Sequence, residues 1–261
     1  MGDMGSFGVC AVIGENATAA AEACAKQILK SLQEALGSQP HATLAVSGGT
    51  SPKMMFAEMA KSAFDWSRVH LFWVDERCVP PDNAESNFRM TREALLDHVP
   101  LQPHQIHRME GELEPEVAAA RYESTLRSTF RLEGAEWPRF DLVALGMGPD
   151  GHTASLFPHT AALHETTRLV VANHVPQMNT WRITLTWPVI NNASSVFFLI
   201  AGADKAEILN EVLTGPRDVE RLPSQLIWPL SGILTLILDK AAAALLPATD
   251  GEGCGFLERD R

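Results

Sequence analysis

The chain has 261 residues, of which 46% are hydrophobic and 20% charged, so it can bury one large core or two small ones. Its formal net charge of -11 disfavours nucleic acid and anionic membrane as partners, but it does not exclude a small anionic ligand. No apolar run reaches the roughly 20 residues that span a bilayer. The four cysteines are far apart, without a C-x-x-C pair, and no signal peptide is recognisable, which predicts a cytoplasmic protein.

The first half of the chain alternates between short apolar runs and longer amphipathic segments. The apolar runs have the length and composition of buried parallel strands, and Asn16 or Thr18 can cap the first helix. Ser86 can cap a later one, which Pro100 ends. Strands are expected at 9–13, 42–46 and 69–74, and helices at 16–36, from 51 onward, at 86–99 and at 115–130.

A glycine turn follows the second predicted strand, in the stretch Ser47-Gly48-Gly49-Thr50-Ser51-Pro52. Ser51 at the cap and Pro52 at the first helical position predict that a helix starts there. A strand, a glycine turn and a helix N-terminus together present backbone N–H groups to an anion, although an ordinary tight turn has the same pattern. The Walker A lysine is missing, so a nucleoside triphosphate is not implied.

Three consecutive charges, Asp75-Glu76-Arg77, follow the third predicted strand. Such a run forms either a solvated loop or a functional site, and its place at the carboxyl end of a strand favours the site. Further on, His104 and His107 are three residues apart with no third ligand nearby. They are therefore interpreted as surface histidines rather than metal ligands.

The stretch Phe140 to Thr160 is the strongest candidate for a site. A predicted strand at 141–145 runs into the turn GMGPDGH, after which Thr153 can cap a short helix that Pro158 stops. Loops at the carboxyl ends of parallel strands hold the ligands of open α/β proteins, and this loop carries Asp150 and His152.

The same turn contains a literal G-x-G-x-x-G, the fingerprint of dinucleotide binding. An acid, Asp150, occupies the place where a pyrophosphate would approach the backbone. In addition, no strand ending in Asp or Glu follows about 20 residues later. Nicotinamide and flavin cofactors are therefore not expected.

The last third of the chain continues the alternation of strands and helices. Lys205 is expected in the first turn of a helix capped by Asp204, where a cation opposes the helix dipole unless it meets an anion. Strands are expected at 168–173, 182–186, 196–201 and 234–238, with a final helix to Leu246.

The order of these elements predicts the architecture. There is no repeat and no long linker, so residues 8–247 are expected to form a single α/β domain, with flexible tails at 1–7 and 248–261. The alternation of strands and helices predicts a three-layer, mostly parallel sheet with helices on both faces. The carboxyl ends of its strands would gather four segments along one edge: 47–50, 75–77, 150–152 and 202–205.

These segments together suggest a chemistry. Arg77, Arg182 and Lys205 could join the glycine turn in binding a phosphate. His152 is the only group in the central loop that titrates near pH 7, and Asp150 could orient it. No G-x-S-x-G elbow and no metal-ligand set is present. The sequence predicts metal-free general-base catalysis on a small phosphorylated compound, and leaves hydrolysis, isomerisation and deamination open.

Five segments in this order resemble the 6-phosphogluconolactonase family, a branch of the glucosamine/galactosamine-6-phosphate isomerase superfamily. They are SGGTSP, VDERCVPPDNAESN, GMGPDGHTASLFP, RITLTWPVIN and GADKAEIL, and the resemblance runs from Val9 to Leu246. It implies hydrolysis of 6-phospho-D-glucono-1,5-lactone to 6-phospho-D-gluconate, the second step of the oxidative pentose phosphate pathway, without metal or cofactor. It also implies a Rossmann-like fold shared with glucosamine-6-phosphate deaminase.

That deaminase is the main alternative. Its loop carries a glutamate where this chain has Phe157, and a tyrosine where this chain has Arg77, so both positions favour the lactonase. A non-catalytic sugar-phosphate sensor is a second alternative. It is disfavoured because no DNA-binding helix pair precedes residue 40.

The resemblance also implies a role for each candidate residue. His152 would activate water, and Asp150 would orient His152 or the substrate. Asp75 would hold sugar hydroxyls or pair with an arginine, and Asn87 would brace a loop. A monomer or a weak homo-oligomer is expected. The phosphate would be held by the glycine turn and three cations: Gly48, Gly49, Thr50, Arg77, Arg182 and Lys205.

Overall fold

The computed structural model describes residues 9–246 and 255–257. The predicted tails at 1–7 and 248–261 lie outside these residues, apart from a short strand at 255–257. Among the described helices, none combines the length and the hydropathy needed to cross a bilayer.

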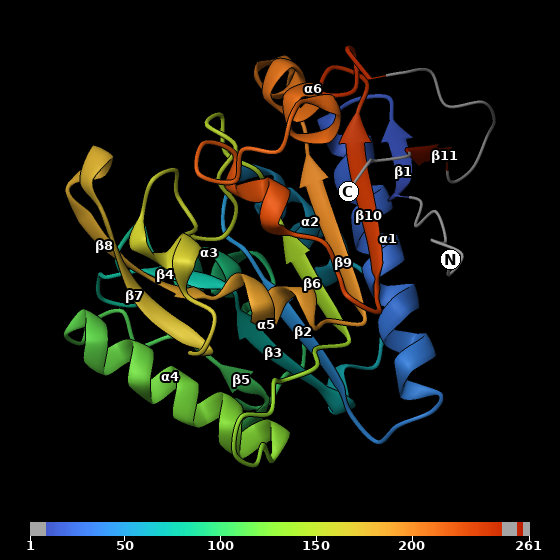
Figure 1. The fold of residues 1–261 in the computed structure, drawn as a ribbon. Coiled ribbons are helices and arrows are strands. Elements are labelled where there is room, and N and C mark those ends of the chain that lie inside the picture. Colours follow the sequence, from blue (N-terminus) through green and yellow to red (C-terminus); the bar gives the residue numbers. More distant parts are fainter. Residues whose placement is uncertain (1–8, 247–254, 258–261) are drawn as a thin grey trace, which may run out of the picture.

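Eight strands form the main sheet, and seven of them run parallel. The eighth, β11, pairs antiparallel with β1 at one edge. Figure 1 shows these strands side by side, so the mostly parallel sheet is confirmed. In spatial order they are β11 (Gly255–Leu257), β1 (Val9–Gly14), β10 (Ile233–Asp239), β9 (Ser195–Ile200), β6 (Leu142–Leu145), β2 (Ala42–Val46), β3 (Val69–Trp73) and β5 (Ile106–His107).

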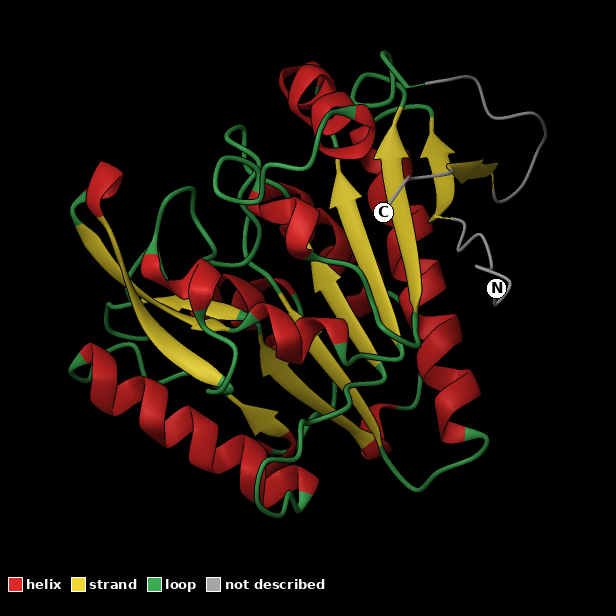
Figure 2. Ribbon diagram, in the orientation of Figure 1, coloured by secondary structure: helices red, strands yellow, loops and turns green. Residues whose placement is uncertain are grey.

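Successive side chains of a strand point to opposite faces of the sheet, and both faces of this sheet are buried. In β2, Leu44 and Val46 belong to one hydrophobic cluster and Ala45 to another. The first cluster includes side chains of α1 (Ala17–Leu36), α2 (Thr50–Ala60) and α3 (Asn87–Ala94). The second includes side chains of α4 (Pro115–Phe130), α5 (Trp187–Asn191) and α6 (Ala206–Thr214). Helices therefore lie on both sides of the strands, as expected (Figure 2).

Helix α1 follows its sequence signals closely. The Asn16 side chain accepts a hydrogen bond from Ala19 N at 3.0 Å, and Gly37 ends the helix. Its buried residues recur at helical spacing, and they include Ala21, Ile28 and Leu32. An N-cap bond of this kind stabilises a helix by about 1 kcal/mol.

A second sheet was not predicted. Strands β4 (Asp75–Arg77), β8 (Thr180–Leu185) and β7 (Val170–Val175) form a separate antiparallel sheet, along which α4 packs (Figure 1). The strands expected at 168–173 and 182–186 therefore exist but leave the main sheet, and the expected loop at 75–77 is a strand. Alternation predicts a strand but does not say which sheet it joins.

Two expected helices are absent. At 153–157 the chain turns back on itself, Thr153 bridges to Leu156, and Ala154 has a positive φ of 49°. The Thr153 hydroxyl donates to Gly146 O at 2.8 Å instead of capping a helix. Residues 240–246 form turns rather than a helix.

Two helix starts also differ from the prediction. Helix α2 begins at Thr50 with Gly49 as its N-cap, ahead of the expected Ser51. Asp204 does not cap α6, because it lies within a preceding 3-10 turn. The short 3-10 helices are Trp66–Arg68, Leu96–His98, Pro103–Gln105, Ala161–His164, Pro176–Met178, Ala203–Lys205 and Pro223–Leu226.

The two histidines read as surface residues differ from each other. His104 is exposed, whereas His107 is partly buried and stacks on Phe72 with ring centroids 4.3 Å apart. Its Nε2 also lies 2.9 Å from Nδ1 of His70. Burial, with the neighbouring histidines adding to it, lowers the pKa of His107 to about 4. The surface interpretation was therefore wrong for His107.

Candidate active site

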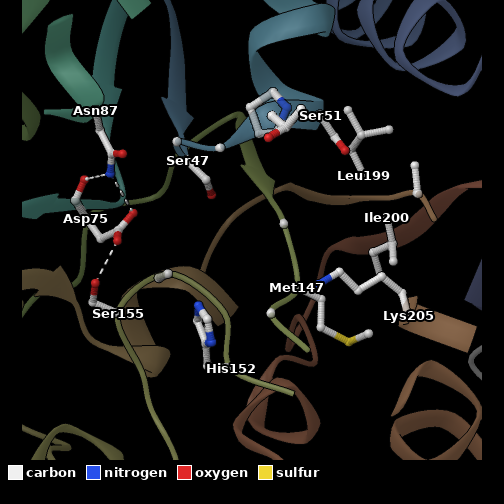
Figure 3. A pocket seen from close by; sticks show the side chains of 18 of the residues that line it. Ser47, Ser51, Asp75, Asn87, Met147, His152, Ser155, Leu199, Ile200 and Lys205 are labelled. Atoms are coloured by element: carbon white, nitrogen blue, oxygen red, sulfur yellow. Dashed lines mark hydrogen bonds between the residues drawn. The ribbon is translucent and has the colours of Figure 1, made fainter. Parts of the chain in front are cut away.

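A cavity of 560 Å³ lies where the carboxyl ends of β2, β6 and β9 meet the small sheet. All but one of the candidate residues line this cavity, although they come from segments far apart in the chain. The exception is Asp150, which reaches the cavity only through His152. Figure 3 shows this arrangement around His152, Asp75 and Lys205. The lining candidates are Gly48, Gly49, Thr50, Asp75, Arg77, His152, Arg182 and Lys205.

The glycine turn brings the N-terminus of α2 to the cavity. Gly49 has a φ of 122°, a conformation that favours glycine, and it leaves the helix without a side-chain cap. A Cβ at Gly48 would lie 1.8 Å from Asn87 Oδ1, so only glycine fits against that side chain. The uncapped helix start therefore offers backbone N–H groups to an anionic ligand.

His152 and Asp150 form a close pair at the end of β6. His152 Nδ1 lies 2.5 Å from Asp150 Oδ1, and this contact leaves the other ring nitrogen, Nε2, available. Burial opposes ionisation of Asp150, but hydrogen bonds and the charge of His152 outweigh it and hold the pKa of this carboxyl below its usual range. Asp150 is therefore an ionised partner suited to stabilise an imidazolium.

Gly148 makes room for this pair. A Cβ at that position would lie 2.1 Å from both Nδ1 and Cε1 of His152. Its N–H donates to His152 O at 2.8 Å, which closes the turn. Gly148, which resembled part of a dinucleotide fingerprint, thus leaves the space that the His152 ring occupies.

Asp75 contacts neither arginine. Its carboxylate accepts a hydrogen bond from Ser155 Oγ at 2.6 Å, and Asn87 Nδ2 donates to its backbone oxygen at 3.0 Å (Figure 3). Asn87 Nδ2 also lies 3.3 Å from Asp75 Oδ1, so Asp75 ties the start of α3 to the loop after His152. Asn87 braces this segment through its bond to the Asp75 backbone oxygen, and it also lines the cavity.

Arg77 and Arg182 face each other across β4 and β8. Arg77 Nη1 donates to Glu85 O at 2.6 Å, and Arg182 Nη2 contacts Met178 Sδ at 3.8 Å, so these contacts leave both charges unneutralised. The Nε atom of each is buried without a hydrogen-bond partner. Burial and the charge of Arg77 lower the pKa of Arg182. Two adjacent cations, neither in a salt bridge with a carboxylate of the described residues, are suited to an anion.

Lys205 extends toward the same space from another wall (Figure 3). Its Nζ lies 3.2 Å from Asp204 Oδ2, and Gly202 before it has a φ of 108°. The structure therefore brings all three predicted cations to one cavity.

Sequence reasoning missed Glu76, whose side chain is 2% exposed. Its carboxylate accepts hydrogen bonds from Asn87 N and Phe88 N, both at 2.8 Å, and from Arg77 N at 2.7 Å. Burial raises its pKa, against these hydrogen bonds. Glu76 anchors the N-terminus of α3 and so positions Asn87 and Arg77. The signal was present in the sequence, because an acid among three charges at a strand end can serve a helix N-terminus.

No group of three or more His, Cys, Asp and Glu side chains suited to a metal ion occurs among residues 9–246 and 255–257. Phe157, one of the two positions expected to favour the lactonase, lies against His152 with ring centroids 4.0 Å apart. An aromatic ring therefore occupies the place next to the histidine.

Comparison with known proteins agrees with this geometry. A 6-phosphogluconolactonase from Nostoc sp. is 43% identical over 220 residues, which is 84% of this chain and 90% of that protein. The solved structure of a 6-phosphogluconolactonase from Trypanosoma cruzi is similar to this chain, with a TM-score of 0.82 and 29% identity over 95% of this chain and all of that one. A monomeric glucosamine-6-phosphate deaminase shares the fold, with a TM-score of 0.76 at 19% identity over 91% of this chain and all of that one. The model of the family described as glucosamine-6-phosphate isomerases/6-phosphogluconolactonase matches residues 15–236, and the chain belongs to this family.

Proposed function

We propose that the protein hydrolyses 6-phospho-D-glucono-1,5-lactone to 6-phospho-D-gluconate. The observation that carries this proposal is one cavity that holds both a paired histidine and unneutralised cations. The histidine suits water activation, and the cations suit a phosphate. Relatives named 6-phosphogluconolactonase, 43% identical in one case, support the same substrate.

In the proposed mechanism His152 acts as a general base on water. Asp150 holds Nδ1, so Nε2 takes the proton as the water oxygen attacks the lactone carbonyl. The imidazolium that forms is stabilised by the Asp150 carboxylate. It then returns the proton to the ring oxygen as the carbon–oxygen bond breaks, which opens the lactone to the acid.

Positive groups around the cavity would serve the two anionic parts of the reacting substrate. These are the phosphate and the oxygen that gains charge during attack. The N–H groups of Gly148 and Gly151 already donate within their own turn, to His152 O and Gly148 O. Both anionic parts would therefore be bound by the N-terminus of α2 and by three cations. The residues of the N-terminus are Gly48, Gly49 and Thr50, and the cations are Arg77, Arg182 and Lys205.

The second candidate is a deaminase acting on an amino-sugar phosphate, since the fold is shared. Against it, Phe157 leaves no carboxylate on that side of His152. The test is acid release from freshly prepared 6-phosphogluconolactone, measured against spontaneous hydrolysis for wild type and His152→Ala. We expect acceleration by wild type alone. If wild type instead releases ammonia from glucosamine 6-phosphate and leaves the lactone unchanged, the proposal is wrong.

A further inference from the structure

The hydrogen bond to Asp150 does not by itself hold the His152 ring in place. The imidazole turns about its Cα–Cβ and Cβ–Cγ bonds, and the Asp150 side chain, which is 45% exposed, can move with Nδ1 while the 2.5 Å contact is kept. Among the described residues, none forms a hydrogen bond with Nε2. The direction in which Nε2 points therefore depends on packing against the ring.

Phe157 supplies that packing. Its ring stacks on the imidazole with centroids 4.0 Å apart and planes 23° from parallel. Rotation of the imidazole about its Cβ–Cγ bond would tilt the ring out of its present plane and drive it into the phenyl ring. Gly148 is so close to Nδ1 and Cε1 that the ring has little freedom there either.

Phe157 is itself held firmly. The side chain is 8% exposed, and its backbone oxygen accepts hydrogen bonds from Thr160 Oγ1 at 2.7 Å and from Thr160 N at 3.3 Å. Thr160 Oγ1 in turn accepts from Asn173 Nδ2 at 3.0 Å, which ties the loop to β7. These contacts hold the backbone of Phe157 in place, and burial restricts the movement of its phenyl ring.

We propose that Phe157 is a positioning residue for His152, which sets the plane of the imidazole so that Nε2 faces the attacking water. This inference rests on the proposed hydrolysis. The phenyl face adds a second effect, because it attracts the ring once His152 becomes positively charged in the transition state. A phenyl ring accepts no proton, so it leaves the proton on His152.

The test compares two variants of Phe157 with a matched control. Phe157→Leu keeps an apolar side chain but removes the flat face, and we expect kcat to fall about 10- to 100-fold, as for a reacting group misplaced by about 1 Å. Phe157 also lines the cavity, but the glycine turn and the cations proposed to bind the phosphate are unchanged, so KM should change less than kcat. Phe157→Tyr restores the face and should keep kcat within about threefold. The control is Phe140→Leu, a buried phenylalanine outside the cavity, which should lower Tm but not kcat.

A second measurement does not depend on activity. In proton NMR, the stacked phenyl ring should shift the His152 ring protons upfield, with the signals assigned by their loss in His152→Gln. The shift should disappear in Phe157→Leu and persist in Phe157→Tyr. Wild-type kcat in Phe157→Leu, or a rise in KM alone, would overturn the positioning role. A wild type that shows the upfield shift but no lactone hydrolysis would instead overturn the proposed function.

Discussion

Replacing Gly148 by alanine tests how the fold positions His152. The added Cβ would lie 2.1 Å from Nδ1 and Cε1 of His152, and 2.8 Å from Asp150 Oδ1. Such contacts are not formed below about 3.0 Å, so one partner must move by about 1 Å. The atoms that the Cβ meets belong to side chains, and the φ of Gly148 is not positive. The fold should therefore persist while the histidine moves.

The expected loss follows from that displacement. A misplacement of about 1 Å in a catalytic group costs about 100-fold in rate, or roughly 2.7 kcal/mol of transition-state stabilisation. Gly148→Ala should thus lower kcat for lactone hydrolysis by about two orders of magnitude, with a small change in KM and in Tm.

Gly146→Ala is the matched control in the same turn. A Cβ there would meet its nearest atom, Leu199 O, only at 4.0 Å. That variant should hydrolyse the lactone at nearly the wild-type rate. The reasoning fails if Gly148→Ala keeps wild-type kcat, or if both alanine variants lose activity to the same extent.

Three further predictions concern the charged groups. Asp150→Asn should lower kcat by about 100-fold or more with a smaller effect on KM, because the imidazolium loses its carboxylate. Steady-state kinetics checks this prediction, and an unchanged kcat would contradict it. Arg77→Ala should raise KM about tenfold or more while kcat changes less, and the reverse pattern would show that its role is catalytic. The pKa of His107 lies at about 4, below the usual 6.5, so the neutral ring stabilises the fold above pH 6.5 and that contribution is lost as pH falls toward 4. We expect a loss of about 1–2 kcal/mol for this partly exposed group, measured by denaturant unfolding at pH 7 and pH 4.5, and the loss should shrink in His107→Phe.

Much of the fold could be predicted because it depends on local chemistry. Buried parallel strands read as short apolar runs, as in Ala42–Val46, and the cap at Asn16 is a contact between neighbours in sequence. The helix predicted at 153–157 is absent for the opposite reason. There the Thr153 hydroxyl bonds to Gly146 O, across the turn, and the chain follows that contact rather than its helical propensity.

The candidate residues and the edge of the sheet where they would gather could be predicted from the sequence alone. Glycine turns and polar residues at strand ends mark sites locally, which is why Gly48 and His152 could be named in advance. How these groups face one another depends on tertiary packing. The pairing of Arg77 with Arg182, the bond from Ser155 to Asp75 and the stack of Phe157 on His152 depend on contacts after the chain has folded back. Alternation along a strand marks a buried face but not the partner across it, so the small sheet and the contacts it creates are set by packing.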